Sequence, residues 1–195
     1  MNNNLKSVDL GQLARQVAQL IIHVLPPKDI FNNSTVLQTC SPNRWRKIES
    51  ELYWFRFTAL HLTFLSMMSP YPYSISTYTA RYIISTAIHL TFYEKGLSEK
   101  EVQVIAHHLS EEIEYYFVHL QLHTLPSSYL NDVEIKKCFV NRLSIKLTEI
   151  GEYYDPNIQA FIELVIENIL KQVKHILHQL MNNITVIELD TIYPK

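Results

Sequence analysis

The chain has 195 residues, 47% of them hydrophobic and 18% charged, a composition typical of a globular domain and not of a disordered chain. A formal net charge of −2 creates no field that would gather phosphates or anionic lipids, so we expect no nucleic-acid partner. The N-terminal residues lack the pattern of a secretory signal, and Cys40 lies far from Cys138, which predicts reduced thiols in a cytoplasmic protein.

The sequence predicts a mainly helical protein. Sheet proteins use glycine often in tight turns, and this chain has only three glycines. The first predicted helix covers residues 8–25 and ends at Pro26, since proline interrupts backbone hydrogen bonding. The second covers residues 42–68: Ser41 caps it, and Pro42 occupies the first helical position, where no hydrogen bond is lost. Apolar side chains occur on nearly every face of this second helix, which indicates that it is buried.

The third and fourth predicted helices are separated by a glycine. The third covers residues 76–95, and Gly96 suits the left-handed conformation that ends many helices. Ser98 and Glu101 form a capping box that opens the fourth helix, which ends before Pro126. Apolar residues recur every three or four positions along this fourth helix, which is the clearest amphipathic pattern in the chain.

The fifth and sixth predicted helices complete the bundle. The fifth covers residues 131–151, and Asn131 makes a second capping box with Glu134. The sixth begins at Pro156 and carries a long apolar stripe that includes Ile169. We expect this sixth helix to lie at the centre of the bundle.

These segments together predict an all-α, single-domain bundle of about six mainly antiparallel helices. We assign residues 1–183 to the bundle and residues 184–195 to a short extended or disordered C-terminal tail. Residues 185–189 are β-prone, but no partner strand is apparent in the sequence. We predict no membrane span, because arginine and histidine interrupt the two most apolar stretches, residues 52–68 and 82–93.

An eight-residue segment of the second helix recurs in the third. Residues 58–65 and 86–93 are identical at six of eight aligned positions, and His61 corresponds to His89. Across a helical hairpin the two imidazoles could hold a metal ion or share a proton, but no third ligand is evident beside them. We therefore interpret both as core histidines that hydrogen-bond carbonyl or hydroxyl groups.

One side of the fourth helix carries a second candidate constellation: His108, Glu112, Tyr115, His119 and His123. His119 and His123 lie one turn apart, a spacing that can chelate a divalent ion with Glu112 as a third ligand. The metal-binding motifs His-Glu-x-x-His and Glu-x-x-His are both lacking, so we favour a solvated helix face and assign no metal site.

Three arginines lie in otherwise apolar stretches of three helices: Arg56, Arg81 and Arg142. Buried guanidinium groups need carboxylate partners, and we favour internal salt bridges over a bound carboxylate or phosphate ligand. The candidate partners are Glu51, Glu94, Glu149 and Glu152. The basic residues 44–47 are surrounded by no nucleic-acid-binding motif and carry no functional assignment.

Tyrosines next to two predicted loops are the best candidates for a partner interface, since tyrosine favours wet contact surfaces. They are Tyr71, Tyr73, Tyr78, Tyr153 and Tyr154. No phosphate-binding glycine loop or nucleophile motif occurs, so we assign no catalytic residue and no cofactor, and an enzyme is the less favoured class.

Two functions follow as hypotheses. The leading one is a non-enzymatic interaction or scaffold protein that self-associates or binds a protein partner through a contiguous apolar, tyrosine-rich patch. The alternative is a helical bundle that binds a small molecule or metal through interior histidines and arginines. That alternative requires a polar-lined cavity reached by His61, His89, Arg56 or Arg81.

Overall fold

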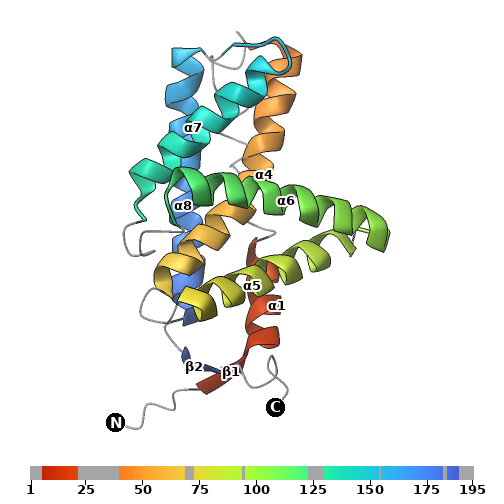
Figure 1. The fold of residues 1–195 in the computed structure, drawn as a ribbon, viewed down its shortest axis with the longest axis vertical. Coiled ribbons are helices and arrows are strands. Elements are labelled where there is room, and N and C mark those ends of the chain that lie inside the picture. The colour runs from red at the N-terminus through yellow and green to blue at the C-terminus, as the bar shows by residue number, and fades with distance from the viewer. Residues whose placement is uncertain are drawn as a thin grey trace.

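Helices account for nearly all of the described chain. The computed structural model describes residues 6–21, 40–68, 73–93, 95–122, 130–153, 155–181 and 184–188 (Figure 1). The helices are α1 (Leu10–Ile21), α4 (Pro42–Met67), α5 (Tyr73–Tyr93), α6 (Glu99–His119), α7 (Asp132–Thr148) and α8 (Pro156–Met181). Two short strands, β1 (Lys6–Asp9) and β2 (Ile184–Glu188), complete the described elements. The predicted bundle of six helices is confirmed.

Predicted caps begin α4 and α6. The Ser41 hydroxyl accepts a hydrogen bond from the backbone N–H of Arg44 at 3.1 Å, which satisfies one of the free amides of α4. At α6, Ser98 and Glu101 exchange side-chain to backbone hydrogen bonds, so the predicted capping box is confirmed.

Asn131 caps α7, but the second predicted capping box is only half formed. The Asn131 side chain accepts a hydrogen bond from the Glu134 backbone N–H at 3.0 Å. The Glu134 carboxylate accepts a hydrogen bond from Lys137 at 3.2 Å instead of returning one to the cap. A lysine one turn along the helix thus competes successfully for the carboxylate.

Three helices end in a residue with a left-handed backbone. Gly96 after α5 has φ of +80°, as predicted, and Gly151 after α7 has φ of +72°. Gln121 after α6 has a left-handed backbone too, with φ of +55°. This helix therefore ends at His119, well before Pro126. In the α5 turn the Leu97 N–H returns to the Phe92 carbonyl at 3.2 Å, the bond that defines this type of helix end.

The central helix of the bundle is α4, because it packs against each of the other five. α8 packs along α4 and α7, while α5 and α6 form an antiparallel hairpin that extends to one side (Figure 1). α1 packs mainly against α5. The prediction that the sixth helix is central is wrong: α8 buries a full apolar stripe, but mainly against α4, α7 and α1.

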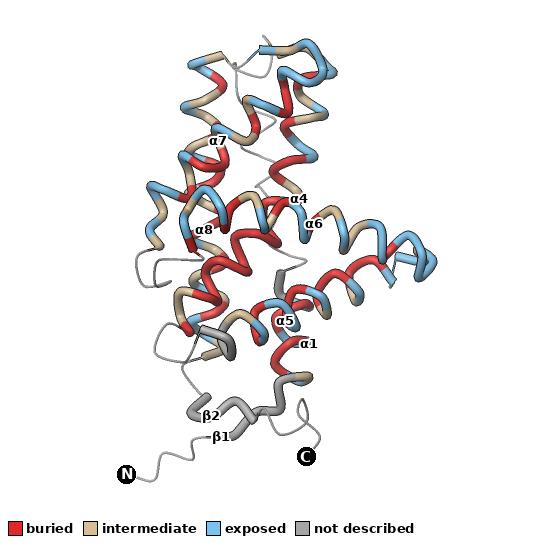
Figure 2. The backbone as a smooth tube through the Cα atoms, in the orientation of Figure 1, coloured by how far each residue is buried: buried red, intermediate tan, exposed pale blue. Residues whose placement is uncertain are grey.

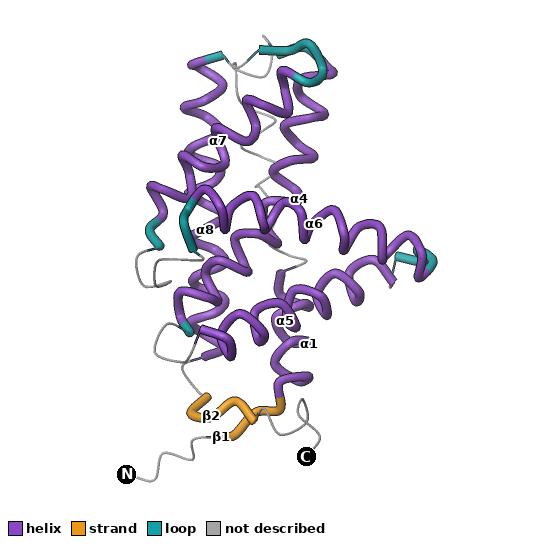
Figure 3. Tube along the Cα trace, in the orientation of Figure 1, coloured by secondary structure: helices purple, strands orange, loops and turns teal. Residues whose placement is uncertain are grey.

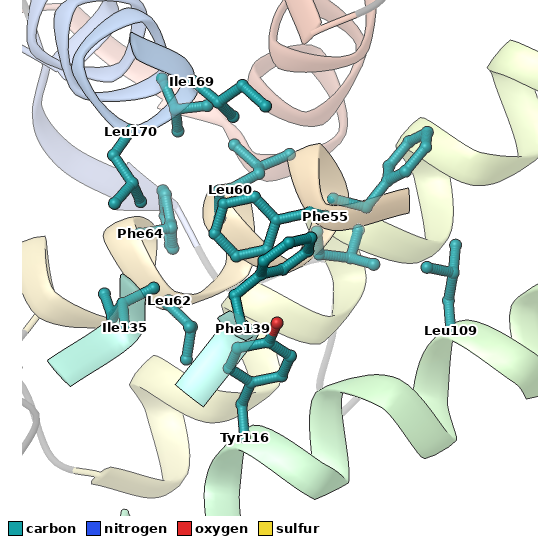
Figure 4. Packing of buried hydrophobic residues seen from close by; sticks show 14 of the residues in the cluster. Phe55, Leu60, Leu62, Phe64, Leu109, Tyr116, Ile135, Phe139, Ile169 and Leu170 are labelled. Atoms are coloured by element: carbon teal, nitrogen blue, oxygen red, sulfur yellow. The ribbon is translucent and has the colours of Figure 1, made fainter. Parts of the chain in front are cut away.

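Aromatic side chains of three helices meet in the core (Figure 4). The Phe55 ring of α4 lies 4.6 Å from the Phe139 ring of α7 and 6.1 Å from the Tyr116 ring of α6, measured between centroids. Ile169 and Leu170 of α8 are fully buried in the same core. The second half of α4 is buried almost continuously (Figure 2), as its apolar faces predict.

The C-terminal run that looks unpartnered in the sequence has a partner. β2 pairs in parallel with β1, with Val8 opposite Ile187 and a register irregularity between Lys6 and Ser7 (Figure 3). The prediction of an extended C-terminal segment is confirmed for residues 184–188. The prediction that this segment has no partner strand is wrong. The sequence predicts that the first helix begins at Val8, but Val8 and Asp9 belong to β1 and the helix begins at Leu10.

Within the described residues, every helix is too short or too polar to cross a membrane.

Candidate functional site

A cavity of about 330 Å³ lies between α4, α5 and α6. α4 contributes His61 to its lining, and α5 contributes Arg81, Ile84, Ser85 and Ile88. With the α6 residues, the lining combines a buried imidazole, one cation, one carboxylate, two serines and apolar side chains, and a mainly apolar wall with a few polar groups is common in ligand sites.

The two facing helices line the cavity with matching patterns. The α6 residues are Ala106, Leu109, Ser110, Ile113 and Glu114. On each helix the lining positions recur at i, i+3, i+4 and i+7, which places them on one face. The space is left because Ser85, Ala106 and Ser110 are much smaller than the leucine or isoleucine that closes a tightly packed helix pair.

His61 is the buried polar residue of this site. Its side chain is 1% exposed, and its ring lies edge-on to Phe117 with centroids 5.5 Å apart. Neither ring nitrogen finds a hydrogen-bond partner among the described residues. Burial, together with the positive charge of Arg81, lowers the pKa of His61 to about 3, so the imidazole is neutral at physiological pH.

The prediction of a hydrogen-bonded core histidine is therefore wrong for His61. Threonine hydroxyls adjacent in sequence do not supply the partner, and the buried Thr63 hydroxyl likewise has none among the described residues. The reason is geometric: side chains two positions apart on a helix point in different directions, so a neighbouring threonine does not face the imidazole.

His89, unlike His61, is not a core residue. It lies on the exposed side of α5 and stacks on Tyr93, with ring centroids 5.3 Å apart and planes 11° from parallel. It does not line the cavity. The sequence repeat does not bring the two histidines together, because equivalent positions on α4 and α5 face different surroundings.

Arg81 lies at the exposed edge of the cavity and forms no ion pair with any carboxylate of the described chain. The sequence-based expectation of a buried, salt-bridged arginine is wrong here, since Arg81 occupies the solvent side of α5. Its guanidinium keeps five donors in a planar fork, the geometry that matches a carboxylate.

Arg56 is buried, as predicted, but outside the cavity. Its guanidinium carbon lies 4.0 Å above the Tyr53 ring centroid and 4.8 Å from that of Phe57. Burial lowers its pKa, while Tyr53 partly offsets the shift. The candidate partner Glu94 lies outside the described residues.

Arg142 is salt-bridged as predicted, but to Glu112. The Arg142 guanidinium donates two hydrogen bonds to the Glu112 carboxylate, at 2.7 and 3.1 Å, and Lys146 lies 2.8 Å from it. Burial raises the pKa of Glu112, but the hydrogen bonds and charges of Arg142 and Lys146 outweigh burial, and the net shift is downward. Glu112 therefore ties α6 to α7 instead of facing a metal.

The other members of the predicted histidine line are also separated. His108 packs edge-on against Trp54, and His119 stacks on Tyr115 with its Nδ1 2.8 Å from the Tyr115 carbonyl oxygen. His123 lies outside the described residues. Within the described chain no three histidine, cysteine or acidic side chains gather as a metal site would require.

The basic segment at the start of α4 is used for packing. Arg44 binds the Glu152 carboxylate through Nε and Nη2, both at 3.0 Å, and its guanidinium carbon lies 4.2 Å from the Tyr153 ring centroid. Lys47 pairs with Glu51 one turn away at 2.8 Å. The Arg44 contacts fasten the connection between α7 and α8 onto α4, whereas the Lys47 pair lies within α4.

Neither cysteine forms a disulfide. Burial raises the pKa of Cys138 to about 12, so its thiol is protonated and a poor nucleophile at neutral pH.

Comparison of the chain with protein-family models, curated proteins and solved structures found no match. His61 and Arg81 stand out in the sequence as polar residues within apolar segments. The α6 lining does not, although Ala106 and Ser110 are small residues one helical turn apart.

Proposed function

We propose that this protein is a helical binding protein that holds a small organic molecule in the cavity between α4, α5 and α6. The observation that carries the proposal is the state of His61: a fully buried imidazole, bordering a cavity, without a hydrogen-bond partner among the described residues. A buried polar group in this state costs about 1–3 kcal/mol, so its place at the wall of a cavity calls for an explanation.

The rest of the lining supports the same function. Ile84, Ile88, Leu109 and Ile113 provide an apolar wall, and Arg81 provides a charged group at the exposed edge. A mainly apolar lining with a few polar groups is the usual composition of small-molecule sites. The volume of about 330 Å³ lies at the lower end of the range of roughly 300–1,000 Å³ that small-molecule sites occupy.

The experiment is a ligand-observed NMR screen with a library of small amphipathic compounds. Compounds that bind the wild type are retested against Ala106→Phe, which places a ring in the cavity. Val104→Phe is the matched control, because Val104 lies on the same helix with its side chain 64% exposed. We expect binding to survive in Val104→Phe and to be lost in Ala106→Phe.

The proposal fails if no compound binds, or if Ala106→Phe binds the same compounds as the wild type. Circular dichroism establishes that each variant is folded. If Ala106→Phe does not fold, Ser110→Phe blocks the cavity from its rim, since Ser110 is a more exposed lining residue.

Self-association is the second candidate function, and it rests on an aromatic stripe along α5. Tyr78, Tyr82 and Tyr93 are 40%, 38% and 61% exposed, and His89 stacks on Tyr93 on the same helix. Their helical spacing places them on one face, and exposed tyrosines are enriched in protein interfaces. Tyr71 and Tyr154 lie outside the described residues, and no side chain is described for Tyr73.

The test of self-association is sedimentation of the wild type and of a Tyr82→Ser/Tyr93→Ser variant over a range of concentrations. A self-associating protein sediments as an oligomer, and the double variant shifts toward the monomer. A wild type that stays monomeric at the highest concentration contradicts this candidate.

A further inference from the structure

We infer that the ligand of the cavity is an amphipathic monocarboxylate, with its carboxylate on Arg81 and its aliphatic body against the isoleucine and leucine side chains of α5 and α6. This inference rests on the proposed binding function and specifies its ligand class.

The charge of the site favours a single negative charge on the ligand. Arg81 is the cation of the lining, and its guanidinium has no carboxylate partner within the described chain. Since His61 is neutral, it adds no second positive charge. Glu114 lines the same cavity, and its negative charge repels a phosphate dianion more strongly than a monocarboxylate.

The hydrogen-bonding groups of the lining also favour an acceptor on the ligand. An arginine only donates, and a planar guanidinium binds a carboxylate through two parallel hydrogen bonds. The Ser110 hydroxyl donates to the Ala106 carbonyl at 2.9 Å, so the rim hydroxyl that remains to donate is that of Ser85. A ligand ammonium would meet the positive charge of Arg81.

The apolar wall accounts for the rest of the ligand. Ile84 and Ile88 lie one turn apart on α5, and Leu109 and Ile113 lie one turn apart on α6. These two pairs border the same cavity and form an apolar surface about one helical turn, or roughly 5 Å, in length. An aliphatic chain of several methylenes fits that length, and each methylene removed from water contributes about 0.8 kcal/mol.

The test compares four probes with the same chain: hexanoate, hexan-1-ol, hexylammonium and hexyl phosphate. Affinities for the purified full chain are measured by ligand-observed NMR or calorimetry. We expect hexanoate to bind about ten-fold more tightly than hexan-1-ol, and hexylammonium and hexyl phosphate to bind more weakly than hexanoate.

The matching variants are Arg81→Gln, Arg81→Lys and Arg46→Gln. Arg81→Gln should reduce hexanoate affinity about ten-fold, to that of hexan-1-ol, without changing the affinity for hexan-1-ol. Arg81→Lys should recover part of the loss, because it keeps the charge without the planar fork. Arg46→Gln removes an exposed positive charge of α4 that does not line the cavity, and hexanoate affinity should stay unchanged.

The outcomes separate the ligand class from the binding function. The monocarboxylate inference is overturned if another probe binds as tightly as hexanoate, or if Arg81→Gln weakens all probes equally. In either case a loss of binding in Ala106→Phe still supports the cavity as a binding site. If no probe binds the wild type, both the inference and the proposed function lose their support.

Discussion

The buried imidazole of His61 on α4 and the exposed guanidinium of Arg81 on α5 line the same cavity, and the charge of Arg81 adds to burial in lowering the pKa of His61 to about 3. One residue is polar but uncharged inside the bundle, and the other is charged at its edge. This pairing is what distinguishes the cavity from an ordinary packing defect, whose walls are apolar.

His61→Phe should raise the stability of the free protein by about 1–3 kcal/mol at neutral pH, because it removes a buried polar group that lacks a hydrogen bond. Phenylalanine keeps an aromatic ring beside Phe117. Urea denaturation measures the change, and His61→Leu serves as a second variant if the larger ring does not fit. A loss of stability in both variants would show that the His61 ring nitrogens do have partners.

The stability of the wild type should fall as the pH drops from about 6.5 to about 3, the interval between the usual histidine pKa and that of folded His61. In this range the unfolded chain binds a proton that the folded chain does not, which costs roughly 1.4 kcal/mol per pH unit. His61→Phe should lack this component of the pH dependence. His89→Phe, which changes the exposed histidine, should keep it. Equal slopes in the wild type and His61→Phe would contradict the neutral, buried state of His61.

Glu112→Gln should destabilise the protein by about 3 kcal/mol or more, since it leaves Arg142 and Lys146 without the carboxylate that neutralises them at the α6–α7 contact. Glu111→Gln is the control on the same helix, because Glu111 is exposed and, within the described part of the chain, its ion-pair partner is the exposed His107. Chemical denaturation should separate the two variants clearly. Similar small losses of unfolding free energy in both variants would mean that the contacts of Glu112 with Arg142 and Lys146 contribute little to stability.

Gly96→Ala should destabilise the protein by about 1 kcal/mol, because an alanine is strained at φ of +80° although no atom blocks its Cβ. Gln121→Gly should have the opposite sign, since Gln121 already adopts a left-handed backbone after α6. Thermal unfolding of both variants measures the two shifts. The account of these helix ends is wrong if both variants shift the midpoint temperature of unfolding in the same direction.

Ile169→Asp should prevent folding, because Ile169 is fully buried in α8 and an unpaired carboxylate there costs several kcal/mol, a large part of the stability of a domain. Expression of soluble protein with wild-type thermal stability would refute this placement. Leu164→Asp is the control on the same helix, as Leu164 is 59% exposed.

Most of the fold could be predicted because its signals are local. Ser41, Ser98 and Asn131 mark helix starts through their own backbone geometry, and Gly96 marks an end. The pairing of β1 with β2 could not be predicted, since it joins the two ends of the described chain and leaves no local pattern. The central position of α4 likewise depends on contacts with all the other helices.

The candidate site could be predicted only in part. His61 and Arg81 stood out as polar residues in apolar segments, but sequence cannot tell which side of a mostly apolar helix faces solvent. That is why His89 and Arg81 were expected inside, whereas both are exposed. The pairing of Arg142 with Glu112 could not be predicted, because it depends on which face of α6 packs against α7.

The most direct test of the binding site is an NMR spectrum of the histidine ring nitrogens in ¹⁵N-labelled protein during titration with hexanoate. We predict that the His61 signals shift saturably in the wild type and in Val104→Phe, but not in Ala106→Phe, while the exposed His89 serves as an internal reference. A ligand that occupies the cavity must change the surroundings of the imidazole at its wall. Saturable binding that leaves the His61 signals unmoved would place the ligand elsewhere and contradict the account.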